Sequence, residues 1–411
     1  MPVEHTRAVI IINIRSITLI VINVAKLIFF QNRMLKDENL IYLLRWIVII
    51  NCQRLDTLNI TRILSMKKIM LIVMLMLSVA AQAQKKYSVY AIGFYNLENL
   101  FDTIHDPGKN DYEYLPDGTN KWNAIKYEHK LANMSKVLSE MATDMLPVGC
   151  AAIGISEVEN ANALNDLVSQ KPLKDKGFQF THVEGPDKRG VDCALLYNPR
   201  LFTVRDTKLV PYIYELPEDV QKDKQTRGFL TVSGEVAGEH VTIIVCHLPS
   251  RYATSYYREL GGKQLKVLKD SLQKDDPKVK IFIMGDMNDD PFDKSIAQSL
   301  GARREIKDVE LFGLYNPFWN TIKEGTGTLF YNGAWNLFDQ IIMSENLLDK
   351  KQKRNYEALT FYKHAIFRRD YLIQQEGKYK GAPKRTQAGG VWLDGYSDHL
   401  PVVVYLIKEQ K

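Results

Sequence analysis

Cysteine is scarce in this sequence, because its 411 residues contain only four. Beyond the amino-terminal part only Cys150, Cys193 and Cys246 remain, an odd number without the close spacing of zinc ligands. This scarcity excludes a disulfide-stapled mini-protein and argues against a cysteine zinc site. We expect the three thiols to be small buried side chains on apolar strands.

Glycine is absent from the first 92 residues, and all 24 glycines lie at or after Gly93. Residues 1–65 are instead rich in Ile, Leu and Asn, with apolar runs such as Ala8–Ile14 and Trp46–Ile50. No run reaches the roughly 18–20 uninterrupted apolar residues of a membrane span. Basic residues interrupt the runs at Arg15, Lys26, Arg33 and Arg45. We interpret residues 1–65 as a non-native upstream extension, or alternatively as a poorly structured, membrane-associated leader.

A secretory signal is expected at residues 66–83. Lys67-Lys68 forms a charged start, Ile69–Val79 an apolar centre, and Ala81-Gln82-Ala83 a cleavage site of small residues. No cysteine follows that site, which disfavours a lipid anchor. The mature protein is expected to begin near Gln84, to be exported to the periplasm or the medium, and to contain no stable membrane span.

An excess of one charge sign is missing from the mature chain. The whole sequence has a net charge of +6, but residues 1–65 hold eight Lys/Arg against four Asp/Glu. Residues 69–411 carry 44 basic and 44 acidic residues. Net charge therefore gives no sign of nucleic-acid binding, and any electropositive surface must be local.

Residues 84–411 read as one α/β domain without repeats or linkers. Helical periodicity recurs from Leu131 to Met141, and helices are also expected near Ala161–Val168 and Tyr257–Gln273. Short apolar stretches between them predict the strands of a mixed sheet with helices outside. These strands are Tyr87–Phe94, Cys150–Ile155, Phe178–Val183, Val191–Tyr197, Phe229–Val236, His240–His247, Val279–Met284, Leu337–Met343 and Leu400–Ile407.

Polar residues of one chemical type follow or precede these strands. Such strand ends gather ligand and catalytic groups in sheet proteins. Carboxylate and amide oxygens suit Mg²⁺ or Mn²⁺ better than zinc, and a hard cation beside imidazoles indicates attack of water on a phosphate ester. The residues concerned are Asn96, Glu157, His247, Asp286, Asn288, Asp398 and His399.

These segments resemble the endonuclease/exonuclease/phosphatase superfamily, which includes abasic-site endonucleases, secreted DNases, neutral sphingomyelinases and inositol-polyphosphate phosphatases. The resemblance spans Tyr87–Lys408 and is strongest for secreted members. Gly-Asp-x-Asn followed by Ser-Asp-His is its most specific part. The segments are Phe94-Tyr95-Asn96-Leu97-Glu98-Asn99-Leu100-Phe101-Asp102, Ser156-Glu157-Val158-Glu159-Asn160, His247-Leu248-Pro249-Ser250, Gly285-Asp286-Met287-Asn288-Asp289 and Ser397-Asp398-His399.

The resemblance implies a four-layer α/β sandwich of two mixed β-sheets packed face to face, with helices outside. It implies that Asn96 and Glu157 hold the divalent metal, with Asp398 beside them. Asp286 would orient or deprotonate the attacking water, and Asn288 would position the substrate.

The resemblance also assigns the imidazoles. His247 and His399 would bind and stabilise the phosphate, and Asp339 would pair with His399 and fix its tautomer. Arg227 and Asp192 match less diagnostic positions and are expected to contact substrate.

Simpler structural roles stay open for several of these residues. Glu157 could cap the helix that follows it, and Asp286 with Asn288 could shape a turn. His247 alone could be a structural histidine. A Ser397-Asp398-His399 triad is disfavoured, because adjacent strand residues point to opposite faces. We expect the five other histidines of the mature chain to be structural; they are His105, His129, His182, His240 and His364.

The substrate is the least defined feature. We expect an exported, metal-dependent nuclease or phosphodiesterase, acting as a monomer on a phosphate ester that could be DNA or RNA. A phosphatase or lipid phosphodiesterase of inositol-phosphate or sphingomyelin type, and a catalytically silent surface binding protein, are the alternatives. Segment Asp349–Arg385 holds eleven Lys/Arg against four Asp/Glu and could border the site or be a solvated loop. Aromatic clusters at Tyr252–Tyr257 and Phe312–Trp319 could stack on bases or pack under loops.

Overall fold

The computed structural model describes residues 70–71, 85–214 and 226–410. The chain divides into two units, Met1–Gln84 and Lys85–Lys411. The expected upstream extension and signal peptide lie outside the described residues, apart from residues 70–71. Within the described ranges, no helix is both long and apolar enough to cross a membrane.

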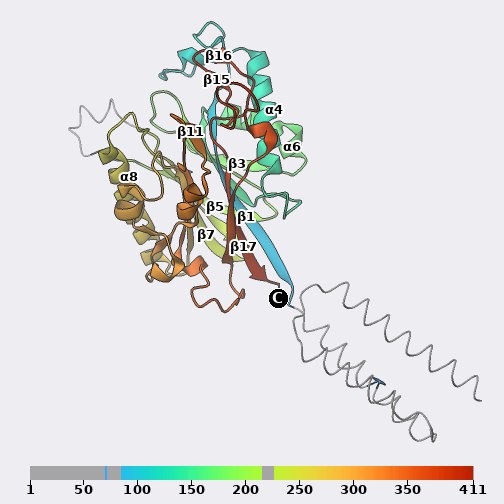
Figure 1. Cartoon of the computed structure of the whole chain (residues 1–411), viewed down its shortest axis with the longest axis vertical. Coiled ribbons are helices and arrows are strands. Elements are labelled where there is room, and N and C mark those ends of the chain that lie inside the picture. The colour runs from blue at the N-terminus through green and yellow to red at the C-terminus, as the bar shows by residue number, and fades with distance from the viewer. Residues whose placement is uncertain (1–69, 72–84, 215–225, 411) are drawn as a thin grey trace, which may run out of the picture. The chain divides into compact units, whose positions relative to one another are not determined.

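The first sheet of the second unit has six strands, and β1 lies near its centre. β1 pairs in parallel with β2 and antiparallel with β17. β1 and β17 therefore lie side by side although they come from opposite ends of the domain (Figure 1). In sheet order the strands are β14 (Thr360–Ile366), β17 (Val402–Glu409), β1 (Tyr87–Leu100), β2 (Ala152–Val158), β4 (Asp192–Tyr197) and β3 (Gln179–His182).

The second sheet has seven strands, with β7 and β8 in parallel at its centre. The β6–β7 hairpin turns through Ala237 and Gly238, whose φ values of 55° and 73° fit the left-handed turn that strand twist favours. In order the strands are β5 (Phe202–Val210), β6 (Phe229–Val236), β7 (Glu239–His247), β8 (Lys280–Asp286), β13 (Asp339–Ser344), β10 (Leu314–Tyr315) and β9 (Ala302–Arg303).

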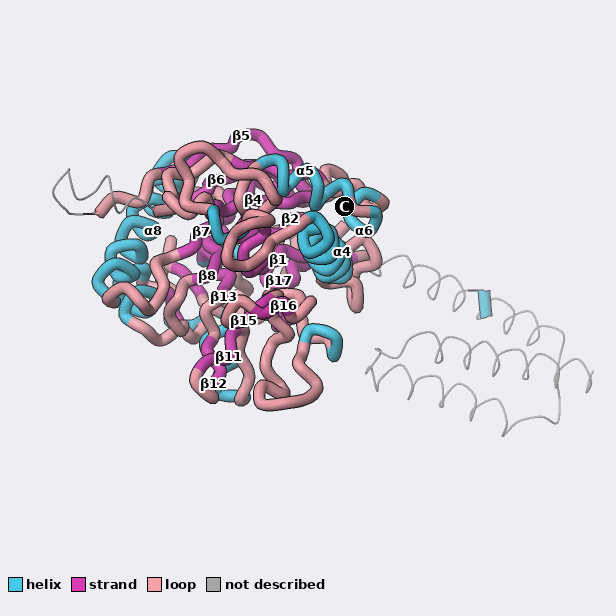
Figure 2. The backbone as a smooth tube through the Cα atoms, turned by 90° about the horizontal axis from the view of Figure 1, so that it is seen from above, coloured by secondary structure: helices cyan, strands magenta, loops and turns pink. Residues whose placement is uncertain are grey.

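Helices cover the outer face of each sheet. α4 (Ala124–Glu140), α5 (Ala161–Ser169) and α6 (Lys171–Lys174) flank the first sheet, and α8 (Ser255–Asp275) with the π-helical turn η2 (Ser295–Leu300) flanks the second (Figure 2). Asn160 begins α5 as its cap, because its side chain accepts hydrogen bonds from two backbone N–H groups of the first turn.

Short elements complete the domain at the sheet edges and in the loops. They are β11 (Leu329–Tyr331), β12 (Ala334–Asn336), β15 (Gln387–Ala388) and β16 (Val391–Trp392), with the 3₁₀ turns η1 (Tyr112–Tyr114), η3 (Ile306–Asp308), η4 (Pro317–Glu324), η5 (Glu345–Leu347) and η6 (Asp370–Leu372).

The core between the two sheets is formed by inward-facing strand residues. Phe94 of β1, Ile243 of β7 and Phe282 of β8 belong to it and are fully buried. The next residue along β7, Ile244, faces the opposite side and packs in a separate core under α8. Because both faces of β7 are covered, its sequence is a continuous apolar run and not an alternating one.

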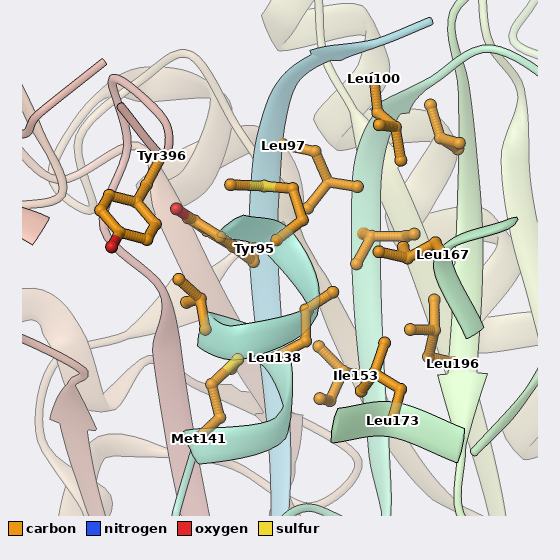
Figure 3. Packing of buried hydrophobic residues seen from close by; sticks show 14 of the residues in the cluster. Tyr95, Leu97, Leu100, Leu138, Met141, Ile153, Leu167, Leu173, Leu196 and Tyr396 are labelled. Carbon is orange, nitrogen blue, oxygen red and sulfur yellow. The ribbon is translucent and has the colours of Figure 1, made fainter. Parts of the chain in front are cut away.

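A third core lies between the first sheet and its helices. Leu138 and Met141 from the α4 region pack against Tyr95 of β1 and Ile153 of β2 (Figure 3). Burying a side chain of this size stabilises the fold by about 1.5–3 kcal/mol. Three cores between helices, sheet, sheet and helices make four layers, so the predicted sandwich is confirmed.

Most predicted elements are present with shifted ends. β1 continues six residues beyond its expected end at Phe94, to Leu100. β5 was not anticipated, since its polar residues Arg205, Asp206 and Lys208 hide the strand pattern of an edge. The three cysteines of the domain are free and buried, as expected.

Candidate active site

The ends of neighbouring strands bring the predicted acids and imidazoles together. His247 at the end of β7 is opposite Asp286 of β8, and Asp286 is opposite Asp339 of β13. In the first sheet, Asn96 is paired with Ser156, the residue before Glu157. The two sheets therefore contribute opposite sides of one site.

A backbone irregularity directs Glu157 toward this site. The β1–β2 register shifts after Asn96, and Glu157 has a φ of 62° in the left-handed region. Such bulges redirect a side chain away from its regular alternation. The Glu157 carboxylate accepts a hydrogen bond from the Asn99 N–H at 3.1 Å, which fixes its second oxygen.

Asn96 is fully buried between the carboxylates of Glu157 and Asp286. Its Nδ2 donates to Glu157 Oε1 at 3.1 Å and to Asp286 Oδ2 at 3.0 Å. Its Oδ1 accepts the N–H of Glu98 at 2.9 Å. The amide thus turns its nitrogen, not its oxygen, toward the acids. In this arrangement the Asn96 amide contacts both carboxylates, and direct ligation of a metal by Asn96 stays a prediction.

Asp286 is buried and its environment resists ionisation. Burial raises the pKa of Asp286 to about 7; the charge of His399 opposes this rise and that of Asp339 adds to it. Its Oδ1 accepts the Asn288 N–H at 2.9 Å, and its Oδ2 lies 3.6 Å from His247 Nε2. A carboxylate whose pKa is close to neutral is well suited to accept a proton from water.

His399 is paired with Asp339, as the resemblance implied. His399 Nδ1 lies 2.7 Å from Asp339 Oδ2, and its Nε2 lies 3.7 Å from Asp286 Oδ2. Burial alone would lower the pKa of His399, but the carboxylates of Asp339 and Asp286 hold it well above the ordinary value. The two carboxylates therefore favour the protonated form of His399, whose Nε2 faces Asp286.

His247 has the opposite protonation preference. Burial lowers the pKa of His247 well below its ordinary value, and the charges of Arg227 and Arg189 lower it further. Its Nε2 lies 3.8 Å from Glu157 Oε1, while its buried Nδ1 has no hydrogen-bond partner among the described residues. The surroundings therefore disfavour protonation of His247 and favour protonation of His399.

Asn288 and Asp398 flank this group. The N–H of Asn288 binds Asp286 and its Nδ2 donates to Leu248 O at 2.9 Å, so the turn suggested by the sequence exists inside the site. Asp398 is less buried, and its Oδ2 accepts from Arg385 Nη2 at 3.0 Å. Both residues line the cleft described below.

Arg227 and Asp192 have different environments. Arg227 lines the cleft and pairs with Asp187 at 2.8 Å. Asp192 is not among the cleft-lining residues, because its carboxylate is occupied by His182 Nε2 at 2.9 Å and by the Gly185 N–H. In the structure Asp192 holds the loop between β3 and β4, and its contact with substrate stays a prediction.

Sequence reasoning did not identify several charged residues of the site. Arg385 bridges Glu98 Oε1 and Asp398 Oδ2, each at 3.0 Å. Arg189 and Asp187 come from the loop held by Asp192. These contacts join positions up to 287 apart, so no local pattern marks them.

The site lies on the floor of an open cleft of about 1380 Å³. Lys378 and Arg385 line it, so the basic segment Asp349–Arg385 does border the site. The aromatic residues at its rim include Tyr252, Tyr331 and Tyr379, whose relative exposures are 103%, 65% and 62%. Phe318 of the other aromatic cluster is buried and serves packing.

The donor set fits a divalent metal. Glu157, His247 and Asp286 offer ligand atoms within 4.8 Å of one another, and Asp286, Asp339 and His399 form a second such group. Buried carboxylates this close repel each other, which agrees with the raised pKa of Asp286. A hard cation held by the Glu157 carboxylate would relieve that repulsion, and oxygen donors suit such an ion.

A family model described as "Endonuclease/Exonuclease/phosphatase family" matches residues 91–408. The chain belongs to the endonuclease/exonuclease/phosphatase family. It is therefore an enzyme of the metal-dependent phosphoester hydrolases, and the alternative of a silent binding protein is not supported. Among curated protein sequences, none matches the chain.

Solved structures similar to the chain are distant in sequence. An endonuclease/exonuclease/phosphatase family protein from Bacteroides thetaiotaomicron is 14% identical, with a TM-score of 0.47 over 79% of this chain and 97% of that chain. A mannosyl-6-phosphatase from the same organism is 14% identical, with a TM-score of 0.46 over 77% of this chain and 99% of that one. TDP2 of D. rerio, complexed with a single-strand DNA product, is 14% identical, with a TM-score of 0.46 over 78% and 99%. None of these likenesses bears on what this chain hydrolyses.

Proposed function

We propose that the protein is an exported, Mg²⁺-dependent phosphodiesterase of the nuclease type. The observation that carries the proposal is the shape and lining of the cleft, which leaves the buried acids and imidazoles open to a long substrate. Its exposed rim tyrosines offer faces on which bases can stack, a contact that every base can make.

The chain's own residues supply a base and a phosphate cradle. Asp286, held by the Asn288 N–H and the Asn96 amide, takes a proton from the attacking water at Oδ2. The His399 imidazolium, oriented by Asp339, donates from Nε2 to a phosphoryl oxygen as charge develops on it. His247, neutral, binds the phosphate from the opposite side.

A divalent metal held by Glu157 would neutralise charge on the phosphate and make water more acidic, and it would leave Asp286 free to act as the base. Asp398 lies beside this group, with its Oδ1 4.0 Å from His399 Nε2. Mg²⁺ is the proposed ion, because carboxylates are its preferred protein ligands. Mn²⁺ has similar preferences and is the natural replacement in an assay.

The proposal is tested by assaying the purified protein on plasmid DNA, single-stranded RNA, bis-p-nitrophenyl phosphate and p-nitrophenyl phosphate. We expect nucleic acid and the diester to be hydrolysed, with loss of activity in chelator and recovery on adding Mg²⁺. Activity on the monoester alone, or on sphingomyelin or inositol phosphates alone, would instead establish the phosphatase or lipid phosphodiesterase.

Export is supported by the sequence pattern at residues 66–83. Expression of the full chain with its own leader, followed by cell fractionation, tests it. We expect the exported product to begin at Gln84. Retention in the cytoplasm with an intact amino terminus would contradict export without affecting the proposed activity.

A further inference from the structure

Two arginines on one wall of the cleft share a single anchor. Arg189 and Arg227 both line the cleft, and they come from the loop before β4 and the residues before β6. Asp187 Oδ2 lies 2.8 Å from Arg227 Nη1, and Asp187 Oδ1 lies 3.6 Å from Arg189 Nε. Asp187 is buried, so it holds both guanidinium groups in one place. The Asp187 carboxylate thus forms ion pairs with both arginines.

The pair retains donors that the described protein does not satisfy. Arg227 is 6% exposed, and its buried Nε has no hydrogen-bond partner among residues 85–214 and 226–410. Arg189 is half exposed, and its only ion pair in the described part of the chain is the 3.6 Å contact, longer than a hydrogen bond. A guanidinium with free donors matches two oxygens of a phosphate.

The strand register places these two arginines beside Glu157 and His247 at the bottom of the cleft. β4 pairs Asp192 with Val158, the residue after Glu157, and Arg189 is three residues before Asp192. β6 pairs Leu230 with Val245, so Arg227 and His247 lie at the same end of this hairpin. The arginines therefore stand next to the Glu157 and His247 side of the site.

The floor already has its own donors for the phosphate under attack, in His247 and His399. The cleft, at about 1380 Å³, also exceeds the roughly 300–1000 Å³ of a typical small-molecule pocket. A further anionic group of the substrate is therefore the ligand that fits the wall formed by Arg189 and Arg227.

We propose that Arg189 and Arg227 form a second anion subsite that binds the phosphate neighbouring the scissile one in a nucleic-acid strand. This inference rests on the proposed nuclease function and makes it more specific. Arg189, the accessible member, determines the preference for a strand over an isolated diester, and buried Arg227 forms the base of the subsite.

Thymidine trinucleotides test the subsite directly. One has two phosphodiesters, and two others carry a neutral methylphosphonate in place of the 5′ or the 3′ linkage. For the wild-type protein, kcat/KM at one remaining phosphodiester should fall about tenfold or more when its neighbour is neutral, the loss expected for one charge-assisted contact. The ratio of kcat/KM with a charged neighbour to kcat/KM with a neutral neighbour measures this preference. Arg189→Gln should bring that ratio close to one, and Arg189→Lys should retain part of the preference.

Arg205→Gln is the matched control. Arg205 is also a half-exposed arginine paired with a carboxylate, Glu235, but it lies in β5 and does not line the cleft. It should keep the wild-type ratio. As a second measurement, Arg189→Gln should reduce the slope of log affinity against log salt by about 0.7 for single-stranded DNA, the value for one lost phosphate contact.

The outcomes separate the two proposals. Cleavage of the trinucleotides without any preference, or an unchanged preference in Arg189→Gln, would overturn the second subsite and leave the nuclease standing. Cleavage of no oligonucleotide would overturn both.

Discussion

At the scale of single residues, Asp286 is the group on which the proposed chemistry depends most. Asp286→Asn keeps the shape and the Asn288 contact but removes the base, so turnover should fall by about 10²–10⁴. Steady-state kinetics at saturating Mg²⁺ measure the loss, and circular dichroism with thermal melting verifies the fold. Near-wild-type turnover would show that another group accepts the proton.

Glu157 is expected to act through the metal. Glu157→Gln removes a charge from a side chain that is 17% exposed, so it should fold. The Mg²⁺ concentration for half-maximal activity should rise at least about tenfold. Titration of activity against Mg²⁺ measures it, with Glu128→Gln on the exposed face of α4 as the control. A titration curve identical to that of the wild type would remove Glu157 from the ligand set.

Residue identities and their order along the chain were readable from the sequence, while their orientations were not. The pairing of His399 with Asp339 was predicted and is present. The direction of the Asn96 amide depends on the Glu98 N–H, which a positive φ of 49° at Glu98 places. The contact of Asp192 with His182 was not foreseen, because His182 belongs to a different strand and only sheet pairing reveals it.

At the scale of elements, the close approach of β7 and β8 positions the strand ends that carry His247 and Asp286. A Cβ on Gly285 would lie 1.9 Å from the backbone oxygen of Cys246, so Gly285→Ala must separate the two strands. We expect a loss of about 1–3 kcal/mol in the free energy of unfolding and a larger loss of activity. Urea denaturation and kinetics measure the two effects.

Gly93→Ala is the matched comparison, since Gly93 is also a strand glycine. Its added Cβ would meet the terminal methyl of Met141 at 2.5 Å, and that flexible side chain can move. Gly93→Ala should therefore destabilise the protein less than Gly285→Ala. The reverse order would mean that β7 and β8 adjust more easily than the α4 region does.

Strands could be predicted from the sequence where both of their faces are buried. β8 and β17 each contain a continuous apolar run, Ile281–Met284 and Val402–Ile407, and were located within a few residues. The edge strand β5 was not recognised, because half-exposed strands carry polar residues on one face. Arg227 was expected to contact substrate, but its pairing with Arg189 through Asp187 could not be foreseen, since loops that meet across the cleft share no sequence pattern.

At the scale of the whole molecule, stability should depend on pH through Glu159. Burial raises the pKa of Glu159 from 4.5 to about 9, and the charges of nearby Asp102, Asp106 and Asp111 raise it further. The folded state then holds a proton that the unfolded state releases above pH 4.5. Stability contributed by this group is present at low pH and is lost as pH rises toward 9.

Glu159→Gln should flatten this dependence while keeping an oxygen that accepts the Asp102 N–H. Melting temperatures between pH 5 and pH 9, compared with those of wild type, measure it. The variant should gain stability relative to wild type as pH rises. A difference that stays constant with pH would show that Glu159 is already ionised in the folded protein.

Glu157 lies in the first sheet and His399 comes just before its strand β17, whereas His247 and Asp286 end strands of the second sheet, so neither half of the sandwich holds a complete set of reacting groups. The apolar core between the sheets thus brings the reacting groups together, and turnover depends on how the two sheets are packed against each other. A shift of one sheet relative to the other would separate the reacting groups and abolish turnover, even while each sheet keeps its own hydrogen bonds.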